Sequence, residues 1–201
     1  MHARCARGLS LLCFGLALSS ATLACATVRF ISPYDQVIDE GLMAYRQQIN
    51  VFVKDLADKS GKPDGTFDAN KGEWNSLQTK IDGLVERAKL QGGERACKLP
   101  TAITERMLAV GGASVPVEVK AEAQASQGTS EGCTVRLLSL IRVQLDLLMQ
   151  IHRETDKCTS TEGTSVSCLR SATAKDALQI TNQSINAAWV VETAKKRGED
   201  S

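Results

Sequence analysis

Cysteine is the residue type with the most chemical potential in this sequence. The chain has 201 residues, with seven cysteines and two histidines. Cys97, Cys133, Cys158 and Cys168 are widely spaced and form no C-x-x-C pair, which argues against a zinc site. Four thiols allow three disulfide connectivities. Their order favours Cys97 with Cys133 and Cys158 with Cys168, because each pair then closes one connection between predicted helices.

Cys25 has a different setting, among small residues just after an apolar segment. Arg4 and Arg7 precede an uncharged apolar run over residues 8–18, which is the layout of a bacterial export signal. The run is about a dozen residues long, whereas a membrane span needs about 20. Residues 22–25, TLAC, resemble the lipobox of bacterial lipoproteins, in which the cysteine thiol is diacylated and the signal is cut before it. The alternative is cleavage after Ala26, at an A-x-A site, which would release a soluble periplasmic protein.

The cysteine count favours the lipid. Cys5 and Cys13 leave with a signal of residues 1–24, so five cysteines remain, and a lipid on Cys25 leaves four that can pair. Two or three acyl chains give durable attachment, whereas one chain binds only marginally. In enteric lipoproteins an Asp after the acylated cysteine favours the inner membrane. Ala26 stands there, so the resemblance implies the periplasmic face of the outer membrane.

The sequence gives little indication of catalysis, calcium binding or nucleotide binding. His152 is the only histidine after residue 24, so a triad hydrolase would have to use it, but its place on an apolar helix face favours burial. A calcium loop starting at Asp64 fails, because Ala69 stands where Gly is needed and Asn75 where Glu is needed. No P-loop, dinucleotide-binding or G-x-S-x-G pattern occurs. We therefore predict no catalytic residue, no cofactor and no metal.

Composition fits one domain with a core of its own. Residues 25–201 are long enough for a single domain. Without Arg4 and Arg7, the 24 basic residues become 22 against 23 acidic ones. This balance indicates no nucleic-acid partner. The basic cluster Lys195, Lys196 and Arg197 falls where a helix should end, and cations there complement the helix dipole.

Apolar residues recur every three or four positions in four segments. The spacing predicts a first helix over residues 33–59, with Ser32 as N-cap, Pro33 at its first position and Asp35 at its third. A second helix is predicted over residues 67–92, ending at Gly92 and Gly93. The third lies over residues 134–154 and the fourth over residues 165–197. Cys158 is expected to end the third helix and Cys168 to begin the fourth.

The stretch between the second and third helices shows no sustained apolar stripe. Residues 92–132 are rich in Gly, Ser, Ala and Gln, and we expect an irregular, exposed excursion. Its VPVEVK segment, residues 115–120, alternates like a strand but contains Pro116. The predicted fold is all-α, an up-down four-helix bundle with a long, partly irregular connection between helices 2 and 3. Residues 1–24 form the signal, 25–31 a short tether and 32–201 the bundle domain.

Both ends of the mature chain resemble one family. VRFISPYDQVIDEG, from Val28, and AKKRG, residues 194–198, resemble the first and last motifs of small, uncharacterised proteobacterial lipoproteins. The resemblance supports the fold and the membrane location but implies no activity. We expect an interaction protein, anchored to the membrane by lipid, with an envelope protein as partner. The alternative is a carrier with a cavity for a small apolar ligand, lined by Tyr45, Phe52 and Trp74.

Overall fold

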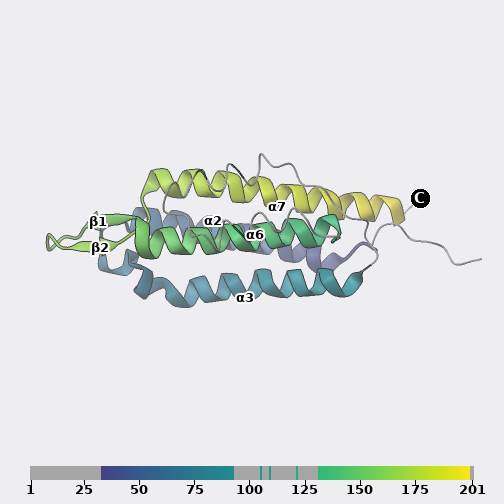
Figure 1. Ribbon diagram of the computed structural model, residues 1–201, viewed down its shortest axis with the longest axis horizontal. Coiled ribbons are helices and arrows are strands. Elements are labelled where there is room, and N and C mark those ends of the chain that lie inside the picture. The colour runs from purple at the N-terminus through teal and green to yellow at the C-terminus, as the bar shows by residue number, and fades with distance from the viewer. Residues whose placement is uncertain (1–32, 93–104, 106–108, 110–120, 122–130, 200–201) are drawn as a thin grey trace, which may run out of the picture. The chain divides into compact units, whose positions relative to one another are not determined.

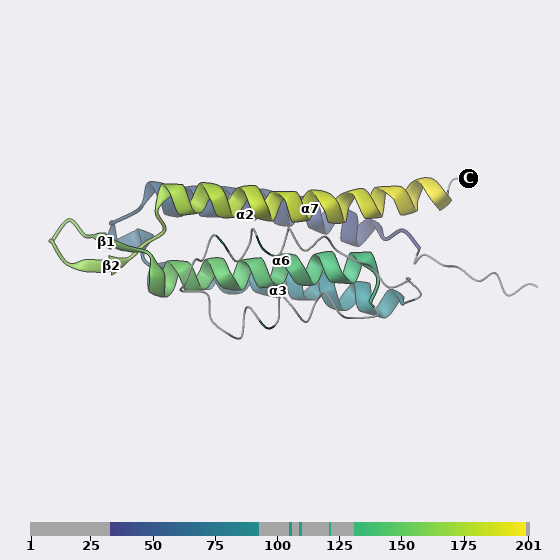
Figure 2. The same cartoon turned by 45° about the horizontal axis from the view of Figure 1, so that its top comes forward.

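Four long helices form the predicted up-down bundle (Figures 1 and 2). The computed structural model describes residues 33–92, 105, 109, 121 and 131–199. The described residues belong to one compact unit. Its long helices are α2 (Gln36–Asp58), α3 (Phe67–Gln91), α6 (Cys133–Gln150) and α7 (Ser171–Glu199). Helix α2 packs on α3 and α7, and α6 packs on the same two helices, so the prediction of an all-α four-helix bundle is confirmed.

The start of α2 differs from the prediction. Asp35 is the N-cap, with extended backbone at φ −126° and ψ 106°, and its carboxylate accepts hydrogen bonds from the N–H groups of Val37 and Ile38. A capping carboxylate satisfies N–H groups that lack partners within the helix. The predicted placement of Asp35 at the third helical position is therefore wrong, and Ser32 lies outside the described residues.

The turn between α2 and α3 contains a short 3-10 helix, η1 (Pro63–Gly65). Helix α3 then begins at Phe67, as predicted, and ends against Gly92. Gly92 has φ 57°, a backbone conformation that favours glycine. The short turn makes α2 and α3 antiparallel neighbours, as the prediction required.

The core lies between the four helices and consists of the residues at the predicted three-to-four spacing. Each helix contributes residues that are almost fully buried, including Leu42, Leu77, Leu138 and Ile185, all at 0% exposure. Helix α6 contributes the widest apolar surface, with residues on several faces buried. This agrees with its sequence, in which apolar residues exceed a single stripe.

The connection from α6 to α7 contains structure that the sequence prediction missed. A π-helical turn, η3 (Ile151–Thr155), extends α6. Strands β1 (Lys157–Thr159) and β2 (Ser165–Ser167) then pair antiparallel, with Cys158 opposite Val166. Helix α7 begins at Ser171 rather than near residue 165, because β2 and a short link occupy the intervening residues. Cys158 therefore lies in a strand, and Cys168 precedes α7.

Three predictions fall on parts of the chain that the structure does not describe. These are the signal and tether of residues 1–31, the strand-like segment of residues 115–120, and Cys97. The expected irregular excursion over residues 92–132 has most of its length outside the described residues as well. All of them stay predictions.

Candidate functional site

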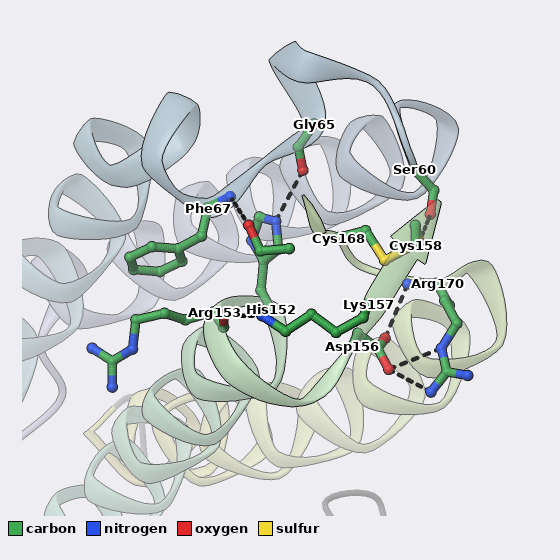
Figure 3. Close-up of a disulfide and its surroundings, with 11 residues drawn as sticks. Ser60, Gly65, Phe67, His152, Arg153, Asp156, Lys157, Cys158, Cys168 and Arg170 are labelled. Atoms are coloured by element: carbon green, nitrogen blue, oxygen red, sulfur yellow. Dashed lines mark hydrogen bonds and ion pairs between the residues drawn. A yellow bond between two sulfur atoms is a disulfide. The ribbon is translucent and has the colours of Figure 1, made fainter. Parts of the chain in front are cut away.

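A disulfide joins the two ends of the β-hairpin, which lies at one end of the bundle (Figure 3). It joins Cys158 of β1 to Cys168, with the two Cα atoms 5.8 Å apart. This is the pair that the chain order favours. Ser60, at the end of α2, places its hydroxyl 3.0 Å from the Cys158 sulfur. Because a disulfide sulfur carries no proton, the hydroxyl is the donor, and the contact ties the hairpin to α2.

An ion pair closes the same connection beside the disulfide. Asp156 is 1% exposed, and its carboxylate accepts from Nε and Nη2 of Arg170 at 2.9 and 2.6 Å and from the Arg170 backbone N–H at 3.0 Å. The Cys168 N–H donates to the carbonyl of Asp156. The two ends of the hairpin are thus joined by covalent, ionic and backbone bonds. Residues 161–165 at its tip are exposed.

His152 lies beneath this hairpin and is fully buried. The Trp74 indole N–H donates to its Nδ1 over 3.1 Å, so Nδ1 carries no proton. Its Nε2 then bears the hydrogen and donates to the carbonyl of Gly65, 3.0 Å away. Burial lowers the pKa of His152 below its usual 6.5, against the opposing effect of the Gly65 carbonyl. A neutral imidazole with both nitrogens occupied is poorly placed to act as a general base.

The second polar cluster, which we term the ionic junction, lies at the other end of the bundle. It joins all four helices, and its members are Asp35, Arg87, Gln91, Thr134, Glu192 and Lys195. Glu192 is 0% exposed and Lys195 is 5% exposed. The Lys195 ammonium donates to Oε1 of Glu192 and to the hydroxyl of Thr134, both over 2.8 Å. Thr134 donates to the same Glu192 oxygen over 2.6 Å.

Asp35 connects the junction to the start of α2. Its backbone N–H points to Oε2 of Glu192, and its carboxylate accepts from Arg87 Nε at 2.6 Å and from Gln91 Nε2 at 2.5 Å. Burial raises the pKa of Asp35, but hydrogen bonds from Arg87 and from the N–H groups of Val37 and Ile38 outweigh it and hold the pKa below 3.8. The carboxylate is therefore charged at neutral pH.

The sequence analysis did not find the ionic junction, and its reading of Lys195 as a cation at the helix end is wrong. Lys195 is instead buried against Glu192. The sequence nevertheless contains a pattern that indicates the ionic junction. On α7 the buried positions of Ile185 and Ala188 continue, at steps of four and three, to Glu192 and Lys195. Opposite charges on the core face of a helix indicate a buried ion pair.

The three aromatics considered as a ligand lining pack in the core instead. Tyr45 and Trp74 are 0% exposed and Phe52 is 7% exposed. Phe52 meets Trp74 edge to face, with ring centroids 4.7 Å apart. A hollow between α6 and α7, beside Gln144 and Ile151, has a volume of about 20 Å³. That is room for about one water molecule.

The segment tested above for a calcium loop, which starts at Asp64, contains Asn70, and this side chain supports the start of α3. Asn70 donates to the carbonyls of Asp64 and Thr66, so its amide completes the turn before α3. Cys133, the first residue of α6, is disulfide-bonded, but Cys97 lies outside the described residues. The pairing of those two stays a prediction.

No family model, curated protein or solved structure matches the chain. Among the described helices, none combines the length and the apolar character that crossing a membrane requires.

Proposed function

We propose that the chain is a lipoprotein of the bacterial outer membrane, anchored by lipid on Cys25, facing the periplasm and acting through contact with an envelope protein. The observation that carries this proposal is Cys25 itself, which follows a basic start and a short apolar run and has small neighbours. One lipid modification accounts both for this setting and for the even number of cysteines that remain.

The ionic junction fits an anchored chain. Nine residues lie between Cys25 and Asp35, so the link spans at most about 35 Å when extended. Asp35 bonds to α3 and α7, so the link enters the bundle where its four helices are fastened together. The hairpin lies at the far end of α2, about 35 Å away for 23 residues at 1.5 Å each (Figure 1).

The packed core favours an interaction protein over a carrier. Tyr45, Phe52 and Trp74 fill the space that a ligand would need, and the hollow beside Gln144 is far below the several hundred Å³ of ordinary ligand sites. A hydrolase has less support still, because His152 is buried with both ring nitrogens bonded.

The first test is lipid attachment. Cells expressing the wild type, Cys25→Ser or Cys13→Ser would be labelled with a clickable fatty-acid analogue, and the protein would then be fractionated. We expect label and membrane association in the wild type and in Cys13→Ser, and neither in Cys25→Ser. An unlabelled wild-type chain beginning at Thr27 would contradict the anchor and support cleavage after Ala26.

The second test looks for the partner. A photo-crosslinking amino acid would be introduced at Thr161 on the hairpin tip, at Leu90 near the ionic junction, or at Gln183 on the outer side of α7. All three positions are exposed. We expect one or more positions to give a discrete crosslinked protein band that is lost when Cys25 is replaced by Ser. No such band from any position would contradict an interaction role.

A further inference from the structure

The two cysteines of the hairpin disulfide differ in their access to solvent. Cys168 is 0% exposed, whereas Cys158 on β1 is partly exposed. A thiolate that breaks a disulfide attacks one of its two sulfur atoms, and access helps to decide which one. Cys158 is therefore the sulfur that a nucleophile from outside the protein can reach.

Ser60 places a hydrogen-bond donor at this accessible sulfur. Its hydroxyl lies 3.0 Å from the Cys158 sulfur, although the two residues are 98 positions apart in the chain (Figure 3). A hydrogen bond to a thiolate stabilises the charged form, and a thiol of lower pKa leaves faster in exchange. Ser60 thus favours a step in which negative charge develops on Cys158.

Opening this disulfide disturbs few packed contacts. Each strand of the hairpin has three residues, and residues 161–165 at its tip are exposed. The start of α7 keeps a second closure, because the buried carboxylate of Asp156 holds the side chain and the backbone N–H of Arg170. The disulfide can therefore open without unpacking the four helices.

We propose that Cys158 is a site of thiol–disulfide exchange with a protein dithiol of the C-x-x-C type. In the first step a thiolate of the partner attacks Cys158 Sγ, the S–S bond breaks, and its electron pair leaves with Cys168. In the second step the partner's other thiolate attacks the partner sulfur of the mixed disulfide, and Cys158 leaves as a thiolate beside Ser60. The partner loses two electrons and two protons, which the two cysteines of this chain gain. The site does not depend on the proposed lipid anchor.

The geometry favours a dithiol over a single thiol. After the first step Cys168 is still held close to Cys158, since their Cα atoms are 5.8 Å apart. It can attack Cys158 again and expel a single thiol, whereas the second thiol of a dithiol completes the reduction. The net rate of reduction therefore depends on how readily Cys158 leaves in the second step.

The first test locates the attacked sulfur in the full chain. The wild type is exposed briefly to reduced glutathione, quenched with acid, unfolded and alkylated. Trypsin cuts after Lys157 and Arg170, so one peptide, residues 158–170, carries both cysteines. Mass spectrometry should find glutathione on Cys158 at least about tenfold more often than on Cys168. Equal amounts on both, a majority on Cys168, or no adduct on this peptide would overturn the site.

The second test measures how fast dithiothreitol, a small dithiol, reduces this bond, with the same peptide as readout. Ser60→Ala should slow the reduction by about fivefold, because the departing Cys158 thiolate loses its donor. Ser60→Thr keeps the hydroxyl and should restore the rate. A purely structural contact predicts the opposite sign, since its loss would loosen the hairpin and speed the reduction.

The matched control is Ser165→Ala, the same change at an exposed position of β2. It should leave the rate of reduction unchanged. Reduction of Ser60→Ala at the wild-type rate or faster would overturn the role of Ser60. An equal slowing in Ser165→Ala would overturn it as well, because the effect would then not come from the contact with Cys158.

Discussion

At the scale of single residues, the most informative side chain is His152, because its surroundings fix its protonation state. Trp74 donates to one ring nitrogen, and the carbonyl of Gly65 accepts from the other. The arrangement links α3, η3 and the η1 turn through one side chain. The histidine that the sequence offered as a possible catalyst is thus part of the packing at this end of the bundle.

We predict that His152 resists protonation. The pKa of the folded state is lowered, so between pH 6.5 and that lower pKa the unfolded chain binds a proton that the folded chain does not. The free energy of unfolding should therefore fall as the pH drops below 6.5, by at most about 1.4 kcal/mol per pH unit. Nitrogen NMR should find the Nε2–H tautomer at pH 7 and should find the ring protonated only below pH 6.5. Titration of His152 near pH 6.5 would contradict this account.

A second prediction concerns the charges of the ionic junction. Lys195→Met leaves the Glu192 carboxylate buried without its cation and should lower the free energy of unfolding by about 3–5 kcal/mol. The double variant Lys195→Met/Glu192→Gln removes both charges and should cost less than the single one. Urea unfolding followed by circular dichroism measures both. If the double variant lost as much as the sum of two single variants, the pair would not be coupled.

At the scale of elements, the hairpin depends on its disulfide. The strands have three residues each and pair only with each other among the described residues, and an isolated hairpin of this kind is marginal in water. We predict that Cys158→Ser/Cys168→Ser loses about 3 kcal/mol of stability, on the loop-entropy model for a separation of 10 residues. Urea unfolding measures the loss. An unchanged urea midpoint in the double variant would contradict this dependence.

The turn between α2 and α3 provides a matched pair of glycines. A Cβ on Gly65 would collide with the carbonyl of Lys59, whereas a Cβ on Gly72, within α3, meets nothing within 4 Å. Gly65→Ala should therefore destabilise the bundle by about 1–3 kcal/mol. Gly72→Ala should stabilise it by up to about 1 kcal/mol, because alanine favours helix. Thermal unfolding of the two variants decides, and a shift in the same direction for both would contradict the structure.

Much of the helical structure could be predicted from the sequence. The apolar residues of α2 and α3 recur at regular spacing, and this spacing is interrupted by Gly61, Pro63, Gly65 and Gly92. The bounds of both helices could therefore be predicted to within a few residues. The cap at Asp35 was missed because Ser32 and Pro33 offered an equally good local signal. The hairpin was missed because residues 157–167 are mostly polar and lack the alternation of a half-buried strand. Its formation depends on the disulfide and on Asp156 with Arg170.

The sites were less predictable than the fold. The pairing of Cys158 with Cys168 follows from chain order, because the two flank one short connection. The ionic junction requires residues from four helices to meet. Contacts between residues that are far apart in the sequence cannot be inferred from the spacing of residues within one helix. The burial of Arg136 is likewise a property of the packed molecule, since an arginine in a helix is usually exposed.

At the scale of the whole molecule, the helices share one core and are fastened at both ends. We therefore predict that the bundle unfolds as one cooperative unit. In a Trp189→Phe background, emission reports on buried Trp74, and circular dichroism reports on all helices. Both signals should give the same urea midpoint. Two separate midpoints would show that the α3 region unfolds independently of the rest.

The bond between the Asp35 N–H and Glu192 is one of several contacts that determine how the bundle responds to mechanical force. A pull on the chain before Pro33 reaches the bundle through Asp35, which is tied to α7 and, through Arg87, to α3. Farther along, Arg46 and Asn50 of α2 bond to Asn186 and Asn182 of α7. Such a pull along the helix axis loads these contacts together, in shear, rather than peeling them apart one after another. Tension on the link would thus be shared among the helices from the outset.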